Sequence, residues 1–248
     1  MRWHLFVPVL TSCLVACSAA GQLAASGDGS ECNTPPDGDR PQYVIGYGSL
    51  MQDDSRKRTS PGAGPAHPVE ISGYRRGWFA RGKTPGFGTT YLGVLPDRAS
   101  HLNAVIYRVD LAELAATDKR EASYCRRGVA ALDIKPLERE YLPAQDAQAW
   151  IYVSSPQSVA APDFRNPIVQ SYVDIFVSGC LEQEQRLGLT DFSQQCLSTT
   201  ADWSEHWVND RIYPRRPFIF QPRAAQIDTL LSRQLPQYFS RIRIESGG

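Results

Sequence analysis

Two neighbouring apolar stretches constrain the fold of this chain more than any other feature of its sequence. Residues 89–95 and 102–109 are rich in β-branched and aromatic side chains, and Pro-Asp-Arg at 96–98 between them is typical of a turn. The pattern predicts two strands of a β-sheet joined by a turn. An apolar fraction of 42% and a charged fraction of 21% are ordinary for a folded soluble protein, which excludes a largely disordered chain.

The rest of the first half predicts further strands and one helix. Short apolar runs at 43–45, 69–71 and 149–153 have the character of strands. Asp110 is a suitable N-cap, because the residues after it carry apolar side chains at helical spacing. We therefore expect residues 42–160 to form an α+β fold, a small, partly closed β-barrel with a helix or two against it.

The second half of the chain changes to a helical pattern. Apolar residues recur every three or four positions, the spacing of a helix with one buried face. The expected helices cover residues 168–181, 192–197 and 224–235. A further helix, capped by Thr200 or Asp202, is expected to carry Trp203 and Trp207. Residues 161–248 are thus predicted to be a helical extension packed on the barrel.

The N-terminus has the features of an export signal. Residues 1–16 carry a basic residue, Arg2, near the start and an apolar run from Leu5 to Ala16 that is too short to span a bilayer. Leu-Val-Ala-Cys at 14–17 resembles the bacterial lipobox, which implies cleavage before Cys17 and a lipid anchor on its thiol. Ser18 is similar to the pattern for sorting to the outer membrane, facing the periplasm. The alternative is a simple cleavage site near Ala20.

The cysteines are consistent with export. Six are present, and outside the cytoplasm those of the mature chain can form disulfides. Cys180 and Cys196 lie on adjacent predicted helices and are the preferred pair. Cys32 lies in residues 17–41, a stretch of small and polar residues that is expected to be a flexible tether. It can be free or paired with Cys125.

Several common activities lack their signatures in this sequence. The formal net charge is zero, so no global basic field attracts nucleic acid. The spacings of His and Cys do not match those of metal sites. Gly48-Ser49 lacks the second glycine of a hydrolase nucleophile elbow. Gly46 and Gly48 have no third glycine at the spacing of a dinucleotide site.

The last part of the chain is locally basic. Arg211, Arg215, Arg216 and Arg223 lie close together in the sequence, with aromatic residues between them. A cluster of this kind can bind an anion. Because the net charge of the chain is zero, an ion-pair network that supports the fold is the favoured interpretation.

A glycine-rich turn after the first expected strand is a candidate for chemistry. Gly46 and Gly48 allow the chain to turn so that the N–H groups of Tyr47, Ser49 and Leu50 point outward together. A nest of this kind binds a carboxylate or stabilises a developing oxyanion. The turn is therefore a candidate binding site for an acidic group.

Glu121 is the second candidate. It lies at the end of the helix predicted after Asp110, where charged residues of both signs alternate from Asp118 to Arg126. Composition alone predicts a solvated salt-bridge residue at such a position. Its distance from the turn in the sequence leaves open whether the two meet in space.

Four segments occur in an informative order. They are residues 44–50, 73–79, 91–95 together with 104–107, and 114–124. The first resembles the Tyr-Gly-Ser-Leu signature of the γ-glutamylcyclotransferase family, particularly its ChaC-type branch. The last is similar to the Leu-Asp-x-x-Glu-x-x-Tyr stretch of that family, which carries the catalytic Glu. The resemblance covers about residues 43–153.

This resemblance implies a fold, an activity and a set of site residues. The fold is the small, partly closed β-barrel of that family, and in the reaction a γ-glutamyl group attacks its own γ-carbonyl through its α-amine, giving 5-oxoproline. Glu121 would be the base, and Tyr91 or Tyr124 would contact the substrate. No cofactor or metal is required. The residues expected to bind the substrate are Ile45, Gly46, Tyr47, Gly48, Ser49 and Leu50.

The substrate and the presence of catalysis stay open. A small γ-glutamyl molecule, glutathione or another γ-glutamyl amide, is the expected partner, with the membrane reached through Cys17 and no nucleic acid. The alternatives are a non-catalytic envelope module that binds an acidic ligand, and a transferase or hydrolase of γ-glutamyl conjugates. Residues 161–248 have no counterpart in the minimal family fold, and Met51-Gln52 departs from the ChaC-type pattern.

Overall fold

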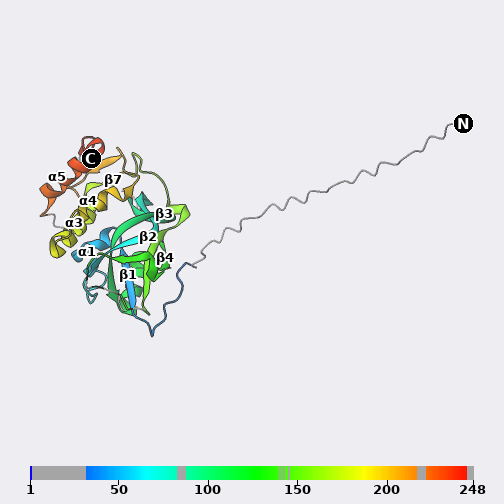
Figure 1. Cartoon of the computed structure of the whole chain (residues 1–248). Coiled ribbons are helices and arrows are strands. Elements are labelled where there is room, and N and C mark those ends of the chain that lie inside the picture. The colour runs from blue at the N-terminus through cyan, green and yellow to red at the C-terminus, as the bar shows by residue number, and fades with distance from the viewer. Residues whose placement is uncertain are drawn as a thin grey trace.

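The apolar runs of the first half form strands, and most of those in the second half form helices (Figure 1). The computed structural model describes Met1 and residues 32–82, 88–139, 141, 143–144, 146–216 and 222–244. Apart from Met1, the predicted signal at 1–16 lies outside the described residues, as do Cys17 and the start of the expected tether.

Most strands precede most helices along the chain. The described strands are β1 (Gln42–Gly46), β2 (His67–Arg81), β3 (Thr90–Val109), β4 (Tyr124–Val129), β5 (Ile134–Pro136), β6 (Gln148–Ser154), β7 (Ile168–Val169), β8 (Thr200–Ala201), β9 (Trp207–Asn209) and β10 (Arg243–Ile244). The α-helices are α1 (Asp53–Lys57), α2 (Leu111–Arg120), α3 (Gln170–Leu187), α4 (Phe192–Ser198), α5 (Ala224–Gln234) and α6 (Pro236–Phe239). Short 3-10 turns are η1 (Ser49–Met51), η2 (Ala131–Asp133) and η3 (Pro156–Ser158).

The main sheet has the strand order β4-β6-β1-β3-β2-β5, and β8 pairs with β2. β1 is antiparallel to β3 and parallel to β6, so the strand that precedes the glycine-rich turn lies inside the sheet. The pairing of β2 with β3 shifts register between Ser72 and Tyr74 and again between Trp78 and Ala80. Irregularities of this kind bend strands and increase the curvature of a sheet.

The expected turn at 96–98 is wrong. The residues on both sides of it pair antiparallel with β2, so β3 keeps its direction through the break. The break is an irregularity within one long strand, in which Asp97 accepts hydrogen bonds from the Ala99 N–H and the Ser100 hydroxyl. Opposite it, Gly73 has a φ of 84°, a conformation that glycine adopts without steric cost.

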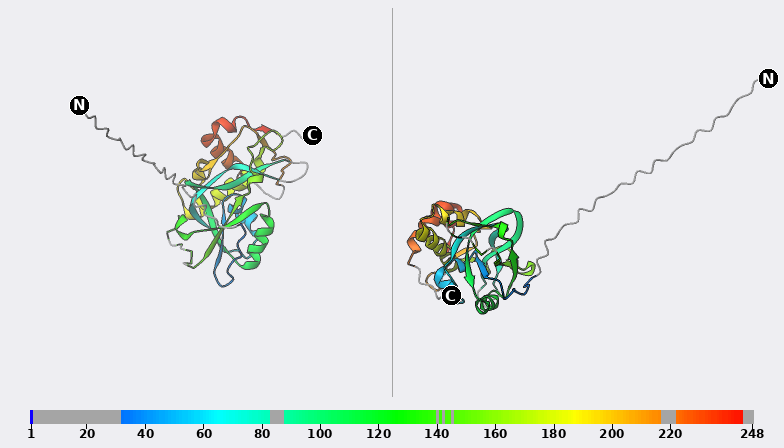
Figure 2. Two further views of the ribbon diagram at one scale, coloured as in Figure 1. Left: turned by 90° about the vertical axis from the view of Figure 1, so that its right-hand side faces the viewer. Right: turned by 60° about the horizontal axis from the view of Figure 1, so that its bottom comes forward.

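Both faces of the central strands are buried, in two different surroundings. Ile45 and Ile151 belong to a hydrophobic cluster made only of residues from the sheet and its loops, which the sheet encloses by curling. Val44 and Tyr152, one position away, belong to a second cluster that includes α3, α4 and α5. Figures 1 and 2 show these helices gathered on one side of the strands. The predicted α+β fold with a partly closed barrel is confirmed.

The helix expected to carry Trp203 and Trp207 is wrong. Thr200 lies in β8, which pairs with β2, and Trp207 begins β9. Asp202 has a φ of 60°, in the left-handed region, and caps no helix. The two indoles stack with centroids 5.2 Å apart in the cluster shared with the helices. A spacing of four residues indicated a helical face, but here backbone pairing to neighbouring strands decides the conformation.

A buried arginine joins the sheet to the helices. Arg76 of β2 is fully buried and donates hydrogen bonds to the carbonyls of Tyr47, Asn103 and Cys196 at 3.1, 2.8 and 2.8 Å. It also donates to the Thr199 hydroxyl at 2.9 Å. Burial lowers its pKa to about 9. Arg76 therefore fixes the turn after β1 relative to the end of α4.

Two disulfides connect segments that are distant in the sequence. Cys180 of α3 and Cys196 of α4 are bonded, with Cα atoms 6.5 Å apart. Cys32 is bonded to Cys125 of β4, and the next residue, Asn33, donates its N–H to the Arg126 carbonyl at 2.9 Å. The described end of the expected tether is thus attached to β4. Among the described helices, none combines the length and the apolar character needed to cross a membrane.

Candidate active site

In the turn after β1, the backbone at Gly46 passes close to Leu50. A Cβ on Gly46 would lie 2.8 Å from the Cβ of Leu50, so glycine is required there. The chain then makes the 3-10 turn η1, in which the Met51 N–H donates to the Gly48 carbonyl at 3.0 Å. Ile45, which precedes the turn, packs inside the curled sheet. Tyr47 packs in the same cluster, whereas Leu50 and Met51 lie on the other face, in the cluster shared with the helices.

A cavity of about 30 Å³, room for one or two water molecules, lies beside this turn. Its lining residues come from the turn, the end of α2, three strands and α3. They are Tyr47, Gly48, Ser49, Leu50, Leu92, Glu121, Tyr124, Tyr152 and Tyr172. The structure thus brings Glu121 together with four of the six residues expected to bind the substrate. Ile45 and Gly46 do not line the cavity.

Glu121 reaches the cavity because α2 ends there. The helix starts with a capping box between Asp110 and Glu113, the N-cap that the sequence predicts. At its other end the Glu121 N–H donates to the Thr117 carbonyl, and the Tyr124 N–H donates to the Glu121 carbonyl. The Glu121 side chain is 17% exposed. Burial raises its pKa above the ordinary value for Glu.

Arg120 links Glu121 to the turn. Its Nε lies 3.2 Å from Glu121 Oε1, and its Nη2 donates to the Ser49 hydroxyl at 3.1 Å. The rest of its guanidinium donates to Ser55 and to the Thr59 hydroxyl. Its positive charge opposes the effect of burial on the pKa of Glu121 without cancelling it. Nothing in the sequence distinguishes Arg120 from the other members of an alternating charged stretch.

Four tyrosines line the cavity, and three of them donate their hydroxyl proton to the protein. Tyr47 donates to the Tyr152 carbonyl at 2.6 Å, and Tyr152 donates to the Asp118 carboxylate at 2.7 Å. Tyr124, an expected substrate contact, donates to the Leu92 carbonyl at 3.3 Å. These bonds hold the three rings in place, and the three hydroxyl protons already have acceptors within the protein.

The fourth tyrosine, Tyr172 of α3, has different partners. Ser49 lies close enough to the Tyr172 hydroxyl to lower its pKa slightly, against the larger effect of burial. A Cβ on Gly48 would lie 2.8 Å from the same oxygen, so this hydroxyl lies in the nest that the sequence analysis assigned to a substrate. Within the described part of the chain, no acceptor takes the Tyr172 proton. Burial raises its pKa to about 12, so the hydroxyl stays protonated at neutral pH.

Tyr91 and Arg216 lie next to the cavity, although neither is among its lining residues. The rings of Tyr91 and Tyr172 meet edge to face, with centroids 4.9 Å apart. The Arg216 guanidinium lies 5.8 Å from the Tyr91 ring and 5.9 Å from the Tyr172 ring. Both Tyr91 and Arg216 are partly exposed. The family resemblance implies Tyr91 as a substrate contact, and the charge balance favours an ion-pair network for Arg216.

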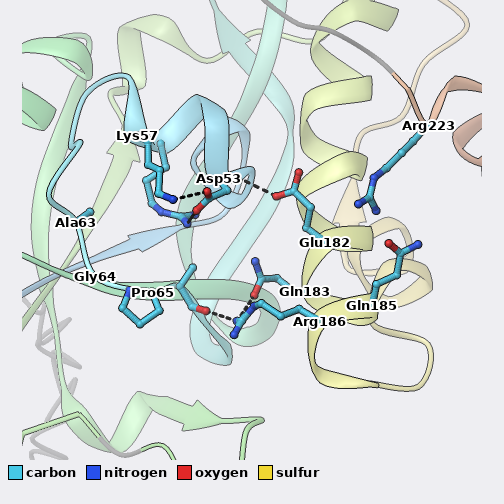
Figure 3. Close-up of a pocket in the computed structure, with 12 residues that line it drawn as sticks. Asp53, Lys57, Ala63, Gly64, Pro65, Glu182, Gln183, Gln185, Arg186 and Arg223 are labelled. Carbon is cyan, nitrogen blue, oxygen red and sulfur yellow. Dashed lines mark hydrogen bonds and ion pairs between the residues drawn. The ribbon is translucent and has the colours of Figure 1, made fainter.

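A second cleft, of about 660 Å³, lies between α1 and α3 (Figure 3). Three of its charged side chains are paired with one another. Asp53 accepts from Arg56 at 2.5 Å and from Lys57 at 2.7 Å, and its N–H donates to Glu182 at 3.0 Å. Glu121 and the glycine-rich turn do not line this cleft. The smaller cavity is therefore the candidate active site.

Comparison with protein families gives a match that includes most of the candidate active site. The family described as gamma-glutamyl cyclotransferase, AIG2-like, matches residues 44–169, just over half of the chain. This chain belongs to the AIG2-like γ-glutamyl cyclotransferase family. The match includes the turn and Glu121, whereas Tyr172 and Arg216 lie beyond it. Family membership supports a γ-glutamyl cyclotransferase-like function, and the ChaC-type branch stays a prediction.

Several solved structures are similar to the chain at low identity. A structure named gamma-glutamyl cyclotransferase is 11% identical with a TM-score of 0.47, over 64% of this chain and 88% of that one. An uncharacterized human protein is 12% identical with a TM-score of 0.49, over 66% and 92%. A yeast γ-glutamyl cyclotransferase described as specific to glutathione is 12% identical with a TM-score of 0.39, over 64% and 97%. Comparison with curated proteins finds no match.

Proposed function

We propose that this chain is a γ-glutamylcyclotransferase that releases 5-oxoproline from a γ-glutamyl amide. The observation that carries the proposal is the position of Glu121 in one cavity with the turn residues 47–50, in a chain of this family. The α-amine of the γ-glutamyl group attacks its own γ-carbonyl, the ring closes, and the bond to the leaving amine breaks. Because nucleophile and electrophile share one molecule, the protein mainly orients them and moves a proton.

Glu121 is the group that moves the proton. The α-amine loses a proton as its bond to the carbonyl carbon forms, and the leaving amine gains one as the old bond breaks. One carboxylate within reach of both nitrogens can serve both steps. Burial raises the pKa of Glu121 toward the range in which a carboxylate exchanges protons efficiently at neutral pH. The Arg120 contact at 3.2 Å holds the carboxylate in place.

Tyr172 stabilises the charge that develops on the carbonyl oxygen. The tetrahedral intermediate places a negative charge on that oxygen, and fixed donors around it lower the barrier. The Tyr172 hydroxyl lies beside Ser49, and no acceptor in the described part of the chain takes its proton. The hydroxyl lines the same cavity as Glu121. We therefore assign it the role of oxyanion donor.

Substrate binding must enlarge the cavity. Its volume of about 30 Å³ is smaller than a γ-glutamyl group. Tyr47 and Leu50 are buried, whereas Tyr91 and Arg216 are partly exposed and can move with less loss of buried contact. The substrate therefore enters on the side of Tyr91 and Arg216.

The test is the formation of 5-oxoproline, measured by mass spectrometry, from glutathione, γ-glutamyl amino acids and γ-glutamyl amines. Glu121→Gln is expected to keep the fold and to lower the rate at least about 100-fold, the scale of a general base. Glu113→Gln is the matched control on the same helix, because Gln also completes a capping box. Folded wild-type protein that forms no 5-oxoproline from any of these compounds would contradict the proposal.

A non-catalytic binding module is the second candidate function. The observation that favours it is the ion pair between Glu121 and Arg120, because paired carboxylates are common structural features. The same Arg120 also bonds Ser49, so the pair does not separate the carboxylate from the turn. Calorimetric binding of a γ-glutamyl compound without turnover would support the binding module.

We propose glutathione or another γ-glutamyl amide as the substrate and a lipid anchor on Cys17 as the means of attachment outside the cytoplasm. The Cys32–Cys125 and Cys180–Cys196 disulfides support an exported protein, because such bonds persist in oxidising compartments. Labelling of the expressed protein with a fatty acid, lost in Cys17→Ser, would establish the anchor. Equal labelling of both forms would contradict it.

A further inference from the structure

The basic cluster near the C-terminus contains arginines of two kinds. Arg211 forms an ion pair with the buried Asp174 at 2.8 Å, which agrees with a structural network. Arg216 forms no ion pair and no hydrogen bond with any described residue. Its described neighbours are the rings of Tyr91 and Tyr172, at 5.8 and 5.9 Å. Its charge is thus available beside the candidate active site.

The two aromatic rings prepare the Arg216 guanidinium for binding. Aromatic rings attract a guanidinium through its face, which leaves the N–H donors at the edge of the plane free for a ligand. The rings themselves are set against each other at 4.9 Å, and Tyr172 is buried in the core cluster. The two rings therefore hold the Arg216 guanidinium next to the cavity with its N–H donors free for a ligand.

Among the described residues around the cavity, the positive charge of Arg216 has no negatively charged partner of its own. Glu121 and Arg120 form a pair at 3.2 Å, and Arg120 directs its other N–H groups to Ser49, Ser55 and a neighbouring hydroxyl. The charge of Arg216 acts on Glu121 as well, second to that of Arg120. Among the described residues, the cavity and its surroundings thus carry a positive charge that an anionic group can balance.

We infer that Arg216 binds the α-carboxylate of the γ-glutamyl substrate, an inference that rests on the proposed function. Every γ-glutamyl group carries this carboxylate, and the nest at the turn already holds the Tyr172 hydroxyl. A bidentate ion pair with Arg216 would hold the α-carbon near Glu121, so that the amine on the same carbon faces the base. Arg216 lies outside the matched residues 44–169.

Two chromogenic amides that differ only in this carboxylate test the inference. γ-Glutamyl-p-nitroanilide carries the α-carboxylate and 4-aminobutyryl-p-nitroanilide lacks it, yet each can cyclise through its own amine and release p-nitroaniline. The wild type is expected to prefer the first in kcat/KM by about 10- to 100-fold, the scale of a charge-assisted hydrogen bond. Arg216→Gln is expected to lower this ratio at least about tenfold, and Arg216→Lys to retain part of it.

Arg243→Gln is the matched control. Arg243 also lies over an aromatic ring, that of Phe164 at 5.3 Å, but it belongs to β10. The ratio of kcat/KM for the two amides in Arg243→Gln should equal that of the wild type. Inhibition by products provides a second measurement, because 5-oxoproline keeps the carboxylate and 2-pyrrolidinone lacks it. Arg216→Gln should raise the inhibition constant of 5-oxoproline at least about tenfold and change that of 2-pyrrolidinone little.

The outcomes separate the inference from the proposed function. An unchanged substrate ratio in Arg216→Gln, an equal loss for both amides, or an unchanged inhibition constant for 5-oxoproline overturns the role of Arg216 while the reaction stands. Folded wild-type protein that releases no p-nitroaniline from either amide and no 5-oxoproline from glutathione or the other γ-glutamyl compounds overturns the proposed function instead.

Discussion

The region that the family matches, residues 44–169, and the helical region after it contribute different groups to one cavity. The matched region provides the carboxylate of Glu121 and the backbone turn that carries Ser49. The helical region provides the hydroxyl of Tyr172 and, beside it, the guanidinium of Arg216. Under the proposed function, Glu121 of the matched region transfers the proton. Arg216 and Tyr172 of the helical region stabilise the negative charges of the substrate and of the intermediate.

The two regions are also joined in their packing. One hydrophobic cluster includes Trp78 and Tyr152 from the sheet together with Phe176 from α3. The Arg76 guanidinium lies 4.8 Å from the Phe176 ring and bonds carbonyls in both regions. A difference in chemical role therefore does not imply two independent folding units.

The largest effect is expected from Arg76→Met. The substitution removes the buried donor that the carbonyls of Tyr47, Asn103 and Cys196 share, although Cys196 still accepts from the Thr200 hydroxyl. Each buried group left unpaired costs about 1–3 kcal/mol. The free energy of unfolding, measured in urea, should fall by at least about 3 kcal/mol. Arg75→Met is the control, because Arg75 is half-exposed and its ion pair is worth at most about 1 kcal/mol. Separate unfolding transitions for the sheet and the helices would contradict a shared core.

Tyr172→Phe is expected to have the next largest effect. It removes one oxyanion donor and keeps the ring, so kcat for 5-oxoproline formation should fall about 100-fold with little change in KM. Tyr238→Phe, in the helical region but away from the cavity, should retain the wild-type kcat. Equal kcat values for Tyr172→Phe and the wild type would restrict the chemistry to the matched region.

The smallest effect is expected in the pH dependence. Burial raises the pKa of Glu121 above the ordinary value of 4.5, so the acid limb of kcat/KM should lie above pH 4.5, with a slope of about tenfold per pH unit. The folded chain then binds the Glu121 proton more readily than the unfolded chain. Its stability therefore falls as pH rises through the folded pKa. Glu121→Gln should remove this loss, so its stability advantage at pH 8 should shrink toward pH 4.

Local pattern predicted the elements that carry the matched part of the site. The run at 43–45, the glycines after it, and the capped helix that ends near Glu121 are all encoded in neighbouring residues. Pattern was wrong where pairing between distant segments decides the conformation. The break at 96–98 stays within β3 because β2 pairs on both sides of it, and Trp207 lies in a strand because β7 pairs with β9.

The sequence by itself determined the α+β class, the position of the turn, and Glu121 as the proton-transfer candidate, because these depend on local spacing and on a motif. Only the tertiary structure decided what surrounds them. Tyr172 lies in an apolar helical stripe, and only the packing of α3 on the sheet brings its hydroxyl to Ser49. Arg216 resembled the other arginines of its cluster until the fold placed it beside two tyrosine rings. Burial and contact between distant residues set those roles, and neither is a property of neighbouring positions in the chain.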